Sequence, residues 1–138
     1  MIIEFIEKWD KYKNELEEYF KTNKQLEYSS YKLIVKALFD IIINKDEEDK
    51  FNTENIVVID DGDYQGTQIF ILHKDWYQPS VGDYVYTNTY YGSCSGCDTL
   101  LAIQDWDLEE LPSEEQIKEY MTLALHLLQK CKYMEEDF

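Results

Sequence analysis

The spacing of apolar residues changes twice along the chain, and this change restricts the fold more than any other feature of the sequence. Residues 2–20 and 113–131 repeat their apolar side chains every three to four positions, which is typical of amphipathic helices. Residues 83–91 instead alternate between two faces, which is typical of a β-strand. Helices at both ends with strands between them predict an α+β fold.

Two helices are predicted in the N-terminal third. In the first, over 2–20, Glu and Lys fill the face opposite the apolar stripe. The second begins at Ser29 or Ser30, since either residue can cap a helix, and runs to Ile42. Its apolar residues cover most of the helix circumference, which predicts a central position in the core. The β-branched run 41–43 leaves a strand as the alternative for its end.

Four antiparallel strands are predicted in the middle of the chain, following one another as a meander. The ranges 55–60 and 66–73 flank a tight-turn sequence at 61–63, which predicts a hairpin. The third strand is 83–91. The fourth is 99–103, although this range also fits a helix.

The C-terminal helix has the clearest start signal. Ser113 followed by Gln116 forms a capping box, and two glutamates lie in the first turn. We expect Cys131, on the apolar stripe, to be a packed core thiol. We expect the helices to pack on one face of the sheet, and residues 1–138 to form a single domain.

The charge of the chain excludes some partners. The sequence has 29 acidic residues and 13 basic ones, all lysine, for a net charge of −16. Phosphate contacts need a cationic face, so direct binding to nucleic acid or to an anionic membrane is not expected. Residues 53–112 have eleven acids and one lysine, a net charge of −10. The negative field is therefore expected to concentrate around the sheet.

The N-terminus and the apolar runs favour a cytoplasmic location. The first residues lack the basic start and unbroken apolar stretch of a secretory signal. The most apolar run, 33–43, is interrupted by Lys36 and Asp40, and is shorter than the roughly 20 residues that span a bilayer. We therefore expect no membrane association.

Cys94 and Cys97 form a C-x-x-C pair, which suits either half of a zinc site or a dithiol that cycles with its disulfide. A second C-x-x-C is missing from the sequence, and Asp98 disfavours the thiolate that redox chemistry requires. We expect a tightly packed turn without a cofactor. Zinc binding and dithiol chemistry at these two residues remain the alternatives.

Signatures of catalysis are sparse. His73 and His126 are far apart in sequence, and the motifs of the common hydrolases and nucleotide-binding enzymes are missing. The acids at 60–63 lack the glutamate that completes an EF-hand loop, which favours a solvated turn over a calcium site. The sequence predicts a protein that is not an enzyme.

One block of the sequence resembles a known group of proteins. Residues 91–100 read Y-G-S-C-S-G-C-D-T-L, preceded by D-Y-Q-G at 63–66 and Q-P at 78–79. This block of about 40 residues resembles small, largely uncharacterised proteins of phages and their bacterial hosts. The resemblance implies a phage or mobile-element setting. Small acidic phage proteins include inhibitors of host defence, anti-CRISPR proteins among them.

These observations predict a non-enzymatic acidic protein-binding domain that docks on a basic surface. Aromatic residues would supply contact energy and carboxylates would steer the encounter. A basic groove normally holds nucleic acid, so the protein would act as a nucleic-acid mimic. A homodimer is a second way to cover the aromatic strand, and acidity that serves only solubility is the plainer alternative. The predicted contact residues are Asp60, Asp61, Asp63, Trp76, Tyr84, Tyr86 and Tyr90.

Overall fold

The computed structural model describes residues 1–26, 31–62, 65–92, 103 and 110–134. Three α-helices and four strands lie within these residues, which confirms the predicted α+β class. Among the described helices, none is long and apolar enough to cross a bilayer.

The helices follow the predicted ranges closely. Helix α1 spans Ile3–Thr22, and α2 spans Tyr31–Leu38. Helix α2 continues into a π-helical turn, η1, over Phe39–Ile43, where the N–H of Asn44 donates to the carbonyl of Phe39 at 2.8 Å. The β-branched run at 41–43 is therefore helical and not a strand. The predicted caps at positions 29 and 30 lie outside the described residues.

Helix α2 and η1 occupy the centre of the core, as their apolar circumference predicts. Phe39 packs edge-to-face against Phe5 of α1 and against Phe51, with ring centroids 6.2 and 5.5 Å apart. The buried residues of this segment are Tyr31, Ile34, Val35, Ala37, Leu38, Phe39, Ile42 and Ile43.

The four strands form an antiparallel sheet in chain order. Strand β1 is Val57–Asp60, β2 is Gly66–His73 and β3 is Tyr84–Tyr91, all within one or two residues of the predicted ranges. The fourth strand differs from the prediction. It is β4, Lys132–Tyr133, which follows the C-terminal helix and pairs with β3.

The predicted fourth strand at 99–103 is not the one that completes the described sheet. Its only described residue, Ile103, is helical and buried, and positions 99–102 lie outside the described residues. Strand β4 has two residues, too few to produce a recognisable alternation in the sequence. It pairs with β3 because the preceding helix, α4 (Glu114–Gln129), brings it there.

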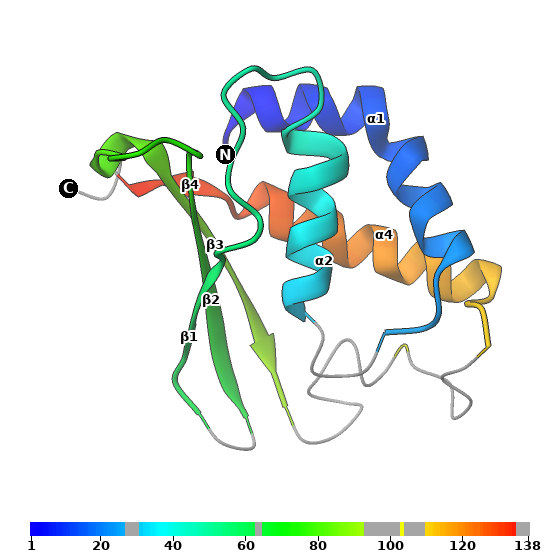
Figure 1. The fold of residues 1–138 in the computed structure, drawn as a ribbon. Coiled ribbons are helices and arrows are strands. Elements are labelled where there is room, and N and C mark those ends of the chain that lie inside the picture. The colour runs from blue at the N-terminus through cyan, green and yellow to red at the C-terminus, as the bar shows by residue number, and fades with distance from the viewer. Residues whose placement is uncertain (27–30, 63–64, 93–102, 104–109, 135–138) are drawn as a thin grey trace.

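The helices lie on one side of the sheet (Figure 1). The inward side chains of β2 and β3 are buried against them, among them Phe70, Leu72 and Val85. The buried hydroxyl of Thr87 donates to the carbonyl of Leu127 at 2.7 Å, which joins β3 directly to α4. The predicted packing of the C-terminal helix on one sheet face is confirmed.

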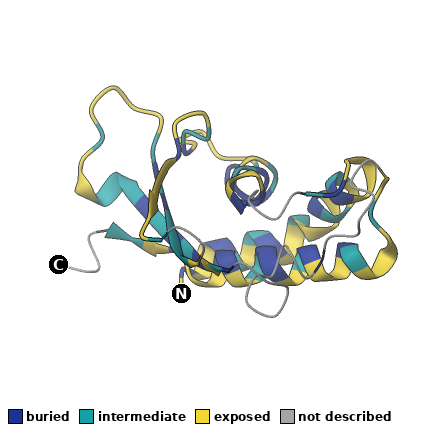
Figure 2. Ribbon diagram, turned by 90° about the horizontal axis from the view of Figure 1, so that it is seen from below, coloured by how far each residue is buried: buried dark blue, intermediate teal, exposed yellow. Residues whose placement is uncertain are grey.

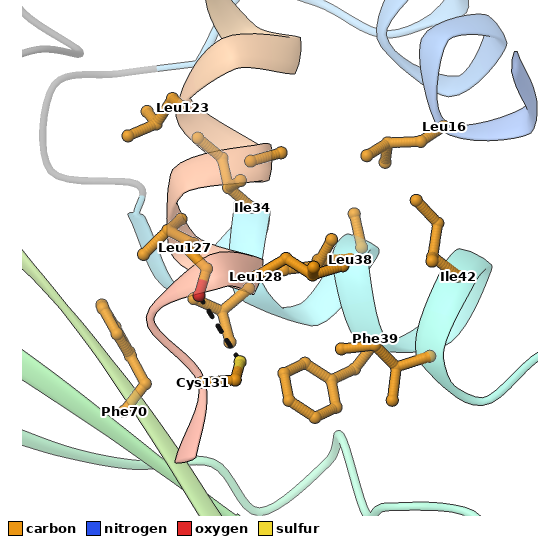
Figure 3. Packing of buried hydrophobic residues seen from close by; sticks show 14 of the residues in the cluster. Leu16, Ile34, Leu38, Phe39, Ile42, Phe70, Leu123, Leu127, Leu128 and Cys131 are labelled. Carbon is orange, nitrogen blue, oxygen red and sulfur yellow. Dashed lines mark hydrogen bonds between the residues drawn. The ribbon is translucent and has the colours of Figure 1, made fainter. Parts of the chain in front are cut away.

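The end of α4 is fixed within the core (Figure 3). The thiol of Cys131 donates to the carbonyl of Leu127 at 3.4 Å and is fully buried. Burial raises the pKa of this thiol to about 12, because an apolar environment disfavours the thiolate. Cys131 is therefore a packed core thiol, as its position on the apolar stripe predicts. At the other end of α4, Ser113 and Gln116 form the predicted capping box.

Candidate protein-binding face

The sheet has a second face, directed away from the helices, that we call the outer face. On β3, alternation turns Val85, Thr87 and Thr89 inward, which leaves the even-numbered residues outside. The strand register then places Ile71 beside both Val57 and Tyr86, and forms a continuous row across three strands. The apolar and aromatic residues of the outer face are Val57, Ile59, Ile69, Ile71, Tyr84, Tyr86 and Tyr90.

The seven apolar residues of the outer face all remain accessible. Val57, Ile59 and Tyr90 are 51%, 48% and 52% exposed. In Figure 2 the buried residues gather in the helices, whereas the strands have mostly intermediate and exposed residues. A contiguous apolar patch in water is a feature of interaction sites.

Tyr84 and Tyr86, two of the predicted contact residues, are half-buried. Both tyrosines have cross-strand neighbours. Tyr84 packs against the imidazole of His73, with centroids 5.6 Å apart, and Tyr86 lies between Ile71 and Lys132 in the register. Such packing limits the rotamers of the tyrosines, so a partner meets rings that are already ordered.

Carboxylates flank the outer face at both ends of the strands. Asp60 and Asp61 lie at the β1–β2 hairpin, and Asp75 and Asp83 lie in the connection between β2 and β3. The apolar centre and charged periphery correspond to the usual arrangement of a protein–protein interface. Five of the eleven acids in 53–112 lie outside the described residues.

Asp60 and Asp61 hold the hairpin turn together. Asp60 accepts hydrogen bonds from the hydroxyl of Tyr91 at 2.5 Å and from the backbone N–H of Gly62 at 3.0 Å. The Tyr91 hydroxyl lowers the pKa of Asp60, and the N–H of Gly62 lowers it further. Asp61 accepts from the N–H of Thr67 at 2.7 Å. These two predicted contact residues therefore have structural roles at the hairpin end of the sheet.

Gly62 is required by the close approach of the turn backbone. A Cβ at this position would lie 1.9 Å from the carbonyl oxygen of Gln65, which is well inside contact distance. The predicted tight turn is thus confirmed at Asp61 and Gly62. The third predicted acid, Asp63, lies outside the described residues.

Trp76 lies in the β2–β3 connection and is 44% exposed. Its indole N–H donates to Asp49 at 3.4 Å, which orients the ring. The next residue, Tyr77, is 97% exposed and was not among the predicted contact residues. Tyr77 lies in a loop, where no alternation of apolar and polar residues indicates which side chains are exposed. The aromatic pair Trp76–Tyr77 close to Pro79 could have suggested an exposed loop tip.

The isoleucines and the valine of the outer face were also missed. In β2 the run Ile69–Leu72 is apolar at every position, so its composition does not show which side chains face the helices. The burial pattern resolves the ambiguity: Phe70 and Leu72 are buried, whereas Ile69 and Ile71 are not. The tyrosines were recognisable because polar threonines alternate with them.

A separate groove of about 560 Å³ lies between α1 and α4. It is lined by the apolar residues Trp9, Ile117 and Met121, with lysines and glutamates of both helices around them. These mixed charges give the groove no single preference for an anionic or cationic ligand. It therefore points to a function less directly than the outer face does.

The cysteine pair cannot be placed in the site. Cys94 and Cys97 both lie outside the described residues. Within the part of the chain that the structure describes, no three His, Cys, Asp or Glu side chains are grouped to hold a metal ion.

Comparisons with protein-family models, curated proteins and solved structures gave no match.

Proposed function

We propose that this chain is a non-enzymatic protein-binding domain whose outer face docks on a basic surface of another protein. The observation that carries the proposal is the accessible apolar and aromatic surface of three strands, with carboxylates at both ends. Tyr86 and Ile71 lie at its centre and are the expected anchors, because central apolar and aromatic contacts dominate interface energies.

The net charge of the chain indicates the charge of its partner. A chain with a net charge of −16 attracts cationic proteins over distances of about 8–10 Å and repels acidic ones. Each described acid from Glu54 to Asp83 has a hydrogen bond or ion pair within the chain, so its carboxylate is ordered before a partner binds. The net charge steers the encounter, and the aromatic residues supply the anchoring contacts.

The biological setting of the proposal comes from the resemblance to phage proteins. We infer that the partner is a nucleic-acid-binding effector of host defence, and that the chain occupies its basic groove. An inhibitor of this anti-CRISPR-like kind needs no catalytic residues, because exclusion of the nucleic acid is sufficient.

The experiment is affinity capture from a bacterial extract with matched variants. Wild type should retain basic proteins that elute as salt rises, and nucleic acid should compete for them. The double variant Ile71→Ala, Tyr86→Ala should lose this capture, whereas Leu33→Ala should keep it. Leu33 is 49% exposed on α2 and serves as the matched apolar control.

Two results would contradict the proposal. One is equal capture by the double variant and wild type. The other is retention of the captured proteins that does not change with salt. Thermal melting of all three proteins shows whether each variant is folded.

A further inference from the structure

Strand β1 lies at the edge of the described sheet and has one neighbouring strand, β2. The N–H of Asp61 donates to the carbonyl of Thr67 at 3.3 Å, which identifies these two residues as a hydrogen-bonded pair. Bonding alternates along an antiparallel pair. The N–H and C=O groups of Val58 and Asp60 therefore point away from β2, towards the open edge.

Two protective features are present at the open edge, the short length of β1 and the inward-facing Asp60, but lysine, proline and a bulge are missing from this strand. Edge strands commonly have lysine, proline or a bulge that prevents pairing with another chain. Strand β1 reads V-V-I-D, and all four residues are exposed. Its first three side chains are apolar, and the only charge is the carboxylate of Asp60. Such an edge is a template for an added strand.

We propose that β1 accepts an extended segment of the basic partner as a fifth strand. This inference rests on the proposed function and names the form of the partner. On the outer face, apolar side chains of the segment would lie beside Val57 and Ile59. On the other face, basic side chains would lie beside Asp60. The expected ligand is thus a strand that alternates apolar and basic residues.

Charge complementarity favours a foreign segment over a second copy. A second copy would bring another net charge of −16 and another V-V-I-D strand. It would also offer no cation for Asp60. A basic segment instead reduces the charge at the hairpin end of the sheet, where Asp60 and Asp61 lie.

The test uses a synthetic peptide of about ten residues that alternates valine and lysine, and a matched peptide that alternates valine and glutamate. The valine–lysine peptide should bind and should slow hydrogen exchange at the amides of Val58 and Asp60. The valine–glutamate peptide should not bind. The exchange measurement reports directly on pairing at the open edge, because these two amides do not donate hydrogen bonds to β2.

Two variants distinguish the contribution of the Val58 backbone to peptide binding from that of its side chain. Val58→Pro removes an N–H that points to the open edge and no β1–β2 hydrogen bond, so the edge strand should tolerate it. It should weaken peptide binding about tenfold more than Val58→Ala, which keeps the N–H. Melting temperatures show whether both variants are folded.

Four results would overturn this inference. Unprotected Val58 and Asp60 amides in the peptide complex, or equal binding by the two Val58 variants, would exclude strand addition. Equal binding of the glutamate peptide would exclude the basic segment. Protection that rises with protein concentration in the absence of peptide would assign the edge to a second copy. Loss of capture in the Ile71→Ala, Tyr86→Ala variant would still support the proposed function in each case.

Discussion

At the residue scale, Asp60 shows how a predicted contact residue acquires a structural role. The sequence presents it as one of three acids at an exposed turn. The structure surrounds its carboxylate with three donors, from Tyr91, Gly62 and Gln68. This set was not recognisable because Tyr91 lies 31 positions away and reaches Asp60 only through the strand register.

The hydrogen bonds to Asp60 predict a pH-dependent stability. Because the folded-state pKa lies below the ordinary value of 3.8, ionised Asp60 stabilises the fold above that pH. The contribution is lost as pH falls through the lowered pKa. Asp60→Asn should therefore melt at a lower temperature than wild type at pH 7, and the difference should shrink below pH about 4.

Two further variants control the pH experiment. Tyr91→Phe removes the hydroxyl that has the largest effect on the pKa of Asp60, and should show the same pH trend. Glu110→Gln removes one negative charge elsewhere and controls for net charge. A difference between wild type and Asp60→Asn that stays constant from pH 7 to pH 3 would contradict the assignment.

The thiols provide a second residue-scale prediction. Cys131 is buried and its pKa is raised to about 12, so it should not react with a thiol reagent in the folded protein. The variant Cys94→Ser, Cys97→Ser should therefore show no reactive thiol when native and one in denaturant. If the cysteine pair only packs a turn, this variant should fold, and a chelator should not change the melting temperature of wild type.

The alternatives for Cys94 and Cys97 give different results in the same experiment. A structural zinc would appear as one metal ion per chain that the double variant loses, with a large fall in melting temperature. Dithiol chemistry would appear as a disulfide between the two cysteines that forms and is reduced again without bound metal. A native thiol signal from the double variant would contradict the burial of Cys131.

At the element scale, helix α4 is the best-determined part of the fold from sequence. The side chain of Ser113 accepts from the N–H of Gln116, and the side chain of Gln116 accepts from the N–H of Ser113. Both bonds are local, so four residues of sequence are sufficient to predict them. The strand that follows this helix was not predictable, because its pairing depends on where α4 ends in space.

The capping box predicts a defined loss of stability. Ser113→Ala should lower the free energy of unfolding by about 1 kcal/mol, because the N–H of Gln116 loses its acceptor. Ser113→Asp keeps an acceptor and should retain most of the stability. Denaturant unfolding measures both values. Equal stability of the alanine variant and wild type would show that the capping hydrogen bonds contribute nothing to the folded state.

At the scale of the whole molecule, the net charge and the outer face have opposite effects on self-association. The outer face favours association, and a net charge of −16 opposes association with another copy. Salt therefore distinguishes the two kinds of partner. Screening should weaken a complex with a basic protein and strengthen a dimer of this chain.

We accordingly predict that the chain is monomeric at micromolar concentration and low salt, as measured by light scattering. Its complex with a captured basic protein should weaken by about tenfold or more between roughly 50 and 200 mM salt, if several ion pairs form at the interface. A stable dimer at low salt would contradict this prediction and would assign the outer face to self-association.

The sequence by itself determined those features that depend on neighbours along the chain. The 3.6-residue and 2-residue periods, the capping box and the hairpin turn each use residues within a few positions of one another, so the helices and the first three strands were predictable. Net charge is additive and needs no structure. The positive charge of the expected partner could therefore be predicted without the fold.

Tertiary structure alone decided what depends on contacts between distant segments. It selected Phe70 and Leu72 over Ile69 and Ile71 as the buried side of β2, because only the helices distinguish the two faces of an apolar strand. It brought the β4 residues to β3 and placed Tyr91 on Asp60. The outer face exists for the same reason: the described helices lie on one side of the sheet, and the other side stays accessible.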